Sequence, residues 1–104
     1  MDNSIQDKLN ILKIGYIKKL ETLVPEFKNY IQNTDVAKID EIYIKVHTIS
    51  GTSGMYGLIE LSEISSDFEV YLKDIKSDVS LYIESDFKER FCKYIDEIER
   101  TIKV

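Results

Sequence analysis

The residue best suited to covalent chemistry is His47, the only histidine in this chain of 104 residues. An imidazole is a competent nucleophile at neutral pH, because a free histidine has a pKa of about 6.5 and is then largely uncharged. Gly51 and Gly54 follow His47 by four and seven residues, so on a helix they lie close to the same face. Glycine costs a helix interior about 0.5–1 kcal/mol relative to alanine. The pattern therefore predicts a strip of bare backbone, where a large partner reaches the ring.

These residues also allow plainer interpretations. A lone histidine on a helix is usually a surface or boundary residue, and the glycines can serve close packing against a neighbouring helix. Access for a partner is the interpretation that we favour, and it is compatible with close packing. A metal or haem site is not predicted, because one histidine without clustered partners makes a poor ligand set.

The single cysteine, Cys92, has no second cysteine with which to form a disulfide or to bind zinc. It lies between Phe91 and Tyr94 in a helical pattern. This position predicts a buried structural thiol rather than a reactive one.

Composition and charge restrict the class of protein. A chain of 104 residues with 43% hydrophobic and 32% charged residues is typical of one soluble globular domain, here residues 1–104. The net charge of −5 argues against nucleic acid or an anionic membrane surface as a partner. The N-terminus has no uninterrupted apolar run, so we expect neither a signal peptide nor a membrane span, and a cytoplasmic location.

The segments that must position His47 show apolar residues every three or four positions, which predicts helices. The first helix covers residues 4–23 and resumes after Pro25, so we expect it to be kinked or broken there. Its predicted core face is Ile5, Leu9, Leu12, Tyr16, Leu20 and Leu23. Asp35 is a suitable cap for the second helix, which Gly57 should stop. The core face of the second helix is Val36, Ile39, Ile42, Val46 and Ile49.

Two further helices are predicted, over residues 58–76 and from 79 or 80 to 102. Their core faces are Leu61, Ile64, Phe68, Tyr71 and Ile75, then Phe87, Phe91, Tyr94, Ile98 and Ile102. Four amphipathic helices with short connections bury these faces best in an all-α, antiparallel, up-and-down four-helix bundle.

On the second helix, His47 lies about 100° around from Val46, at the shoulder of the core face. Ile44 lies further out, and Tyr43 lies between the core face and this outer side. Tyr43 and Ile44 are therefore candidates for a docking patch, although a single exposed isoleucine is also ordinary. Met55 and Tyr56 are expected to pack in the core or the turn.

Around His47 the chain resembles the histidine-containing phosphotransfer (HPt) domain of phosphorelays. That family has a histidine followed by lysine at three residues, glycine at four, a small residue at six and glycine at ten. The residues that match in identity and spacing are His47, Gly51, Ser53 and Gly57. Pro25 late in the first helix, Asp35 before the second and a leucine-rich helix after Gly57 also fit. The resemblance covers about residues 12–102.

The resemblance implies a phosphocarrier rather than an enzyme with its own nucleotide site. His47 would accept a phosphoryl group from the aspartyl phosphate of a receiver domain and pass it to another receiver. The partners would be response-regulator receiver domains or a hybrid histidine kinase, and the receiver would supply Mg²⁺. The chain itself would need no cofactor and act as a monomer. In agreement, Gly51-Thr52-Ser53-Gly54 lacks the lysine and spacing of a nucleotide-binding P-loop.

One position departs from the family pattern: Ser50 stands where the family has its lysine. Lys45 faces the opposite side of the helix, and the third helix has no lysine before Lys73. The Ser50 hydroxyl can donate a hydrogen bond to a phosphoryl group, which helps less than a charged donor. Two alternatives therefore stay open, a docking module that binds receivers without transfer and a helical scaffold or dimerisation domain in which His47 is incidental.

Overall fold

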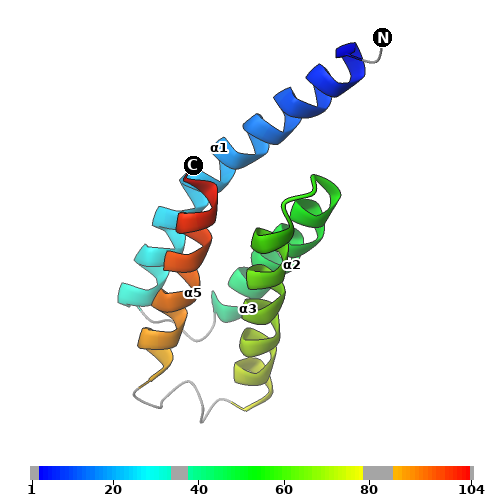
Figure 1. Cartoon of the computed structure of the whole chain (residues 1–104). Helices are drawn as coiled ribbons and strands as arrows, with labels where there is room; N and C mark the ends of the chain where they lie inside the picture. Colours follow the sequence, from blue (N-terminus) through cyan, green and yellow to red (C-terminus); the bar gives the residue numbers. More distant parts are fainter. Residues whose placement is uncertain (1–2, 34–37, 79–85, 104) are drawn as a thin grey trace.

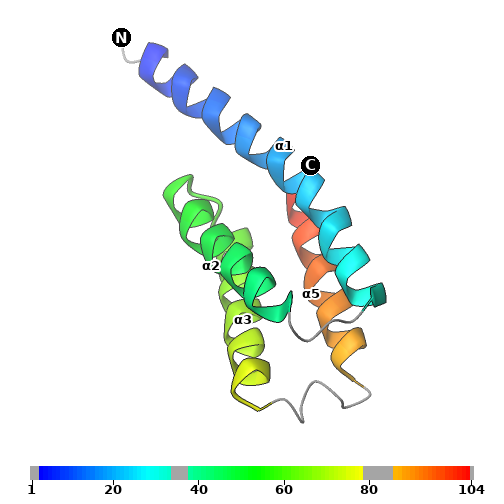
Figure 2. The same ribbon diagram turned by 180° about the vertical axis from the view of Figure 1, so that it is seen from behind.

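The computed structural model describes residues 3–33, 38–78 and 86–103. In these residues the chain forms four helices, α1 (Asn3–Asn33), α2 (Ile39–Met55), α3 (Ile59–Ser77) and α5 (Phe87–Ile102). The helices run alternately up and down, with α2 beside α3 and α1 beside α5 (Figures 1 and 2). The all-α four-helix bundle that the periodicity predicts is confirmed.

The core forms where the helix stripes meet, and aromatic rings occupy its centre. Phe68 of α3 and Phe91 of α5 are fully buried, and their rings meet edge to face at 5.2 Å between centroids. The Tyr94 ring stacks on the other side of Phe68 at 4.9 Å. Such pairs add about 0.5–1.5 kcal/mol to the free energy that burial supplies. These contacts hold α3 against α5 and so fix the hairpin of α2 and α3 on the bundle.

The turn between α2 and α3 is closed by Gly57, whose φ of 73° lies in the left-handed region that glycine tolerates. The amide of Leu58 donates to the carbonyl of Ser53 at 2.9 Å, and that of Gly57 to Gly54 at 3.1 Å. These two bonds form a Schellman motif, which ends a helix by satisfying its last carbonyls. The prediction that Gly57 stops the second helix is confirmed.

The first helix is continuous, because α1 runs through Pro25 to Asn33. A proline removes one backbone hydrogen bond without having to end a helix, so of the two predicted outcomes a break does not occur. The predicted cap Asp35 and the predicted start of the fourth helix at 79 or 80 lie outside the described residues. Within them, α2 begins at Ile39 and α5 at Phe87.

The first half of α1 extends beyond the bundle, which gives the molecule an elongated shape of 56 × 22 × 19 Å (Figure 1). We call residues 3–15 the overhang. The prediction that Ile5, Leu9 and Leu12 belong to the core is wrong, because all three are exposed. The apolar stripe becomes buried only from Leu20 onward, where α1 reaches the other helices.

The thiol of Cys92 is exposed, so the prediction of a buried cysteine is also wrong. Its neighbour Phe91 is fully buried, as is Ile95 one turn later. A residue next to Phe91 lies about 100° further around the helix. Cys92 therefore lies beside the face that packs and not within it.

Candidate functional site

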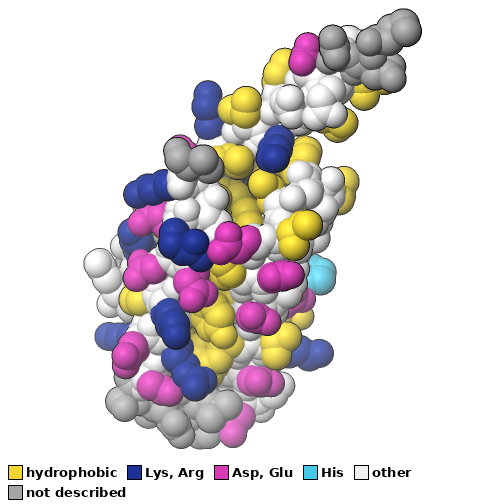
Figure 3. All heavy atoms as spheres, viewed as in Figure 1, with side chains coloured by type: hydrophobic (Ala, Val, Ile, Leu, Met, Phe, Trp, Pro, Cys, Tyr) yellow, Lys and Arg dark blue, Asp and Glu magenta, His cyan; other side chains and the backbone are white. Residues whose placement is uncertain are grey.

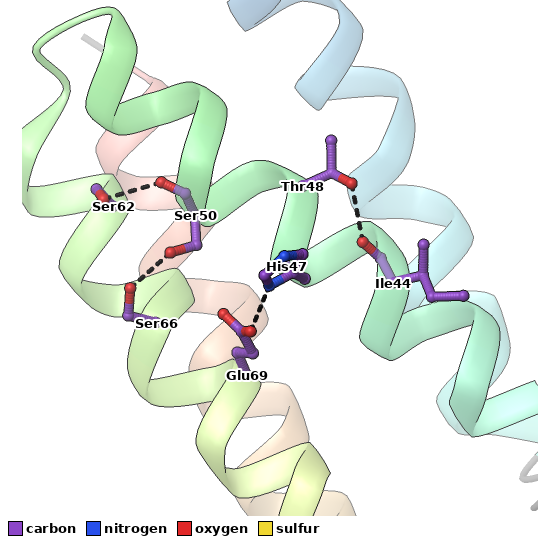
Figure 4. A network of polar contacts seen from close by, with 7 residues as sticks. All are labelled: Ile44, His47, Thr48, Ser50, Ser62, Ser66 and Glu69. Carbon is purple, nitrogen blue, oxygen red and sulfur yellow. Dashed lines mark hydrogen bonds and ion pairs between the residues drawn. The ribbon is translucent and has the colours of Figure 1, made fainter.

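His47 lies on the outer side of α2, and its side chain is 67% exposed. The shoulder position that the sequence predicts is confirmed (Figure 3). Its Nδ1 pairs with Oε1 of Glu69 from α3 (Figure 4). The structure gives Nε2 no hydrogen-bond partner among the described residues. One ring nitrogen is therefore fixed by the protein, and the other faces solvent.

Glu69 is the site residue that sequence reasoning missed, because it belongs to another helix and lies 22 positions from His47 in the chain. Its side chain is 20% exposed, so it is partly shielded from solvent beside the imidazole. A carboxylate at Nδ1 accepts the proton of that nitrogen and leaves the lone pair of the neutral ring on Nε2. The carboxylate therefore selects the tautomer that is nucleophilic at the exposed nitrogen.

The pairing of His47 with Glu69 belongs to a regular seam between α2 and α3. The pairs across this seam are Gly54 with Ser62, Ser50 with Ser66, His47 with Glu69, and Asp40 with Lys76. The partners of each pair lie equally far from Leu58, at four, eight, eleven and eighteen residues respectively. Two antiparallel helices joined by one tight turn therefore place His47 opposite Glu69.

Ser50 lies in this seam, one turn after His47, and its hydroxyl and carbonyl both contact α3. Its hydroxyl lies 2.6 Å from the hydroxyl of Ser66, and its carbonyl accepts a hydrogen bond of 3.0 Å from Ser62 (Figure 4). The contacts described for Ser50 are with these two serines and not with His47. Ser50 therefore joins the two helices, a role that the sequence did not predict.

Tyr43 lies one turn before His47, and the two rings stack at 6.3 Å between centroids with 17° between their planes. Over the Tyr43 ring lies the ammonium of Lys76, 4.3 Å from the centroid, which also pairs with Asp40 at 2.7 Å. A cation over an aromatic face is attracted by about 0.5–1 kcal/mol at an exposed site. Tyr43 thus supports the imidazole on one side and holds a lysine on the same surface.

Gly51 and Gly54 differ in their surroundings. A Cβ at Gly51 would meet nothing within 4 Å, whereas one at Gly54 would meet the Ser62 hydroxyl at 3.5 Å, an ordinary contact. Gly54 therefore faces α3, in keeping with the packing interpretation. At Gly51 nothing inside the protein requires glycine, which favours access from outside.

Ile44 lies one turn before His47 on the outer side of α2, and its side chain is 61% exposed. Its carbonyl accepts a hydrogen bond of 3.0 Å from the Thr48 hydroxyl. Ile44, His47 and Gly51 follow one another at three and four residues along the helix, so they form one row. The outer side of α2 thus exposes an apolar side chain, an imidazole and bare backbone next to one another.

Lys45 points away from this row, as predicted, and pairs with Glu26 of α1 at 3.2 Å. The cation over the Tyr43 ring is Lys76, seven residues after Glu69. It belongs to α3 near its end.

The candidate site is a surface rather than a pocket. A hollow of about 430 Å³ lies elsewhere, between α1 and α5, where Lys28, Phe91 and Cys92 contribute to its lining. Nothing from α2 lines this hollow, so it has no part in chemistry at His47. Within residues 3–33, 38–78 and 86–103, no three side chains of the metal-ligating types come together.

None of the helices in the described part of the chain has the length and apolar character needed to span a bilayer.

Comparison of the chain with protein-family models, curated proteins and solved structures found no match.

Proposed function

We propose that this chain is a phosphorelay intermediate in which His47 accepts a phosphoryl group on Nε2 from an aspartyl phosphate and passes it on. The observation that carries the proposal is the pairing of Nδ1 with Glu69 while the rest of the imidazole is exposed. The carboxylate orients the ring, which a chance surface position would not require. Here the protein orients one nitrogen and leaves the other accessible.

The chemistry needs little from the chain beyond this nucleophile. The lone pair on Nε2 attacks phosphorus, a P–N bond forms, and the P–O bond to the partner's aspartate breaks, so the electron pair leaves with the carboxylate. The proton on Nδ1 stays between the ring and Glu69, where the carboxylate offsets the positive charge of the substituted imidazole. The reverse sequence returns the phosphoryl group to a second receiver. The receiver supplies Mg²⁺, since phosphoryl transfer depends mainly on positioning and charge neutralisation.

The surroundings of His47 suit a large protein donor rather than a small molecule. The ring stands on a convex helix surface, and the row of Ile44, His47 and Gly51 offers an apolar contact on one side and room for a close approach on the other. Receiver domains or the receiver of a hybrid histidine kinase are the partners that we propose, and the cytoplasm is the location. The chain acts in this scheme as a carrier without a nucleotide site.

One observation favours a second function, a docking module that binds receivers without transfer. The hydroxyl of Ser50 is engaged by Ser66, and the side-chain contact described for His47 is with an acid, Glu69. A phosphoryl group on His47 would then lack the charged donor that the resemblance leads us to expect. In this alternative the row of Ile44, His47 and Gly51 still binds receivers, and only the covalent step is absent.

The test is transfer from phosphorylated receiver domains, with the intact mass of the chain as readout. The proposal expects an acid-labile gain of one phosphoryl group in the natural chain and none in His47→Gln. Gln at this position keeps a similar size, so receiver binding should persist in the variant. Binding without any mass gain would establish the docking module, and absence of both would overturn the family-based interpretation.

A further inference from the structure

The overhang carries apolar surface that nothing in the described chain covers. Ile5, Leu9 and Leu12 continue the stripe of Tyr16 and Leu20, yet their side chains are between 48% and 60% exposed. Figure 3 shows hydrophobic side chains on the surface of this part of the molecule. A helical segment this short is only marginally stable in water by itself, and contiguous exposed apolar surface marks an interaction site.

Two other residues make the overhang apolar on both sides. Ile11 and Ile14 are 67% and 54% exposed, and they lie roughly half a turn around the helix from the stripe. A helix with one apolar stripe packs on one surface. A helix with two opposite apolar sides fits between two surfaces.

Two such surfaces exist at the same end of the molecule. One is the stripe of the overhang, and the other is the α2–α3 turn, where Met55 and Ile59 are 85% and 69% exposed. The expectation that Met55 packs in the core or the turn is thus wrong. Tyr16 fixes the direction of the stripe, because its hydroxyl lies 3.0 Å from that of Ser53 near the end of α2. Beyond Tyr16 the overhang runs past the end of the bundle where α2 and α3 join (Figure 2).

We infer that a second copy of this chain occupies the space between these surfaces and forms a two-fold symmetric dimer. The two overhangs lie antiparallel, stripe against stripe, with Leu9 near the axis. The side with Ile11 and Ile14 then packs on the partner's Met55 and the partner's Ile59. Because the interface is isologous, each contact occurs twice. The chain itself thus provides both the two-sided helix and the surfaces that receive it.

The charges of the overhang and of α3 favour a second copy of the chain as the occupant. Residues 3–20 contain four lysines and one acidic residue, although the whole chain carries −5. Lys8 and Lys18 flank Ile11 and Ile14, whereas Glu60 and Glu63 follow Ile59. The ion pairs among the described residues include neither these lysines nor Glu63, whereas Glu60 pairs with Arg100. In the dimer the basic overhang thus meets the acidic start of the partner's α3. A membrane is the less favourable occupant, because the acidic bundle repels anionic lipid.

This dimer replaces the monomer expected from the sequence and does not depend on the proposed function. His47 lies on the outer side of α2, away from the overhang, so it stays accessible in the dimer (Figure 3). Phosphoryl transfer and self-association are therefore separate properties, and a failure of either leaves the other in place.

The first test is the mass in solution by light scattering, over concentrations of about 1 µM to about 1 mM, where weak and moderate dimers dissociate. We expect twice the 12.1 kDa of the chain at the upper end. Leu12→Asp should remain monomeric throughout, whereas Val70→Asp should still dimerise. Val70 is a matched control because it is similarly exposed, on the outside of α3. Circular dichroism establishes that both variants are folded.

The second test examines the arrangement with single-cysteine variants in a Cys92→Ser background. Ile11→Cys mixed with Ile59→Cys should give a disulfide between unlike chains on oxidation, and each variant alone should give much less. A chain that stays monomeric at every concentration overturns the inference. Binding of the overhang to anionic lipid vesicles without dimerisation would also overturn it, in favour of a membrane surface. A dimer that Leu12→Asp leaves intact would show that the interface is elsewhere.

Discussion

Glu69 pairs with Nδ1 of His47 across two helices, although 22 residues separate them in the chain. Both residues lie eleven positions from Leu58, so the tight turn at Gly57 sets their register. The partly shielded carboxylate of Glu69 orients the ring, and Nε2 is left as the nucleophilic nitrogen.

Replacing Glu69 with glutamine should slow phosphoryl transfer by roughly tenfold to a hundredfold, because a hydrogen bond to a charged group contributes about 1.5–3 kcal/mol. Stopped-flow or quenched-flow transfer from a phosphorylated receiver measures the rate. Glu63→Gln on the same helix removes an equal charge away from His47 and serves as the control. Equal rates for Glu69→Gln and the natural chain would show that the pairing has no role in transfer.

Replacing Ser50 with alanine should leave the transfer rate unchanged, because its hydroxyl contacts Ser66 rather than His47. The same change should lower the free energy of unfolding by about 0.5–1.5 kcal/mol, the net value of a typical hydrogen bond. Ser50→Lys adds a cation near the imidazole and should raise the rate or prolong the phosphohistidine. A large loss of rate in Ser50→Ala would place the hydroxyl at the phosphoryl group instead.

Replacing Gly51 with alanine should raise the free energy of unfolding by about 0.5–1 kcal/mol, since a Cβ there meets open space. Gly51→Leu should weaken receiver binding, measured by calorimetry, because the larger side chain occupies the approach to His47. Gly15→Ala is the control, since Gly15 also has open space around it but lies on the overhang. If Gly51→Leu binds receivers as well as Gly15→Ala does, Gly51 does not face the partner.

Alkaline pH should destabilise the fold through Tyr71. Burial, followed by the negative charge of Asp86, raises the pKa of Tyr71 to about 12. An unfolded tyrosine has a pKa of about 10 and loses its proton first, so stability is complete below pH 10 and falls as the pH rises to about 12. Burial also raises the pKa of Tyr16 and Tyr94, which adds to the same loss.

Thermal melts of the natural chain and Tyr71→Phe at pH 8 and pH 11 measure this effect. The variant should lose less stability between the two pH values than the natural chain does. An identical loss would assign the alkaline destabilisation to other groups.

The periodicity of the sequence predicted the helices and most of the core well, because a buried stripe leaves a repeat of three and four residues. It could not show where a stripe loses its partner. Leu9 and Leu20 look alike in the sequence, yet only Leu20 reaches the other helices. The aromatic neighbours of Cys92 predict a buried thiol, whereas the position of the residue around the helix decides its exposure.

The site could be predicted in part. His47 and its row on α2 follow from local spacing, so Ile44 and Gly51 were placed correctly on the outside. Glu69 and Ser66 belong to another helix, and their positions require the register between α2 and α3. The sequence did contain a signal for that register, since residues equally distant from Leu58 become neighbours once Gly57 is taken as the turn. The same counting would have shown that Ser50 faces Ser66.

The regular seam has a consequence for how the molecule assembles. Every polar contact described for His47, Ser50 and Tyr43 lies within one helical hairpin, closed by the short connection at Gly57. A short loop loses little entropy on closure, and contacts near in sequence form early in folding. The geometry around the imidazole can therefore arise before α1 and α5 dock, and the two outer helices are left free to diverge in sequence while the chemistry of the hairpin is retained.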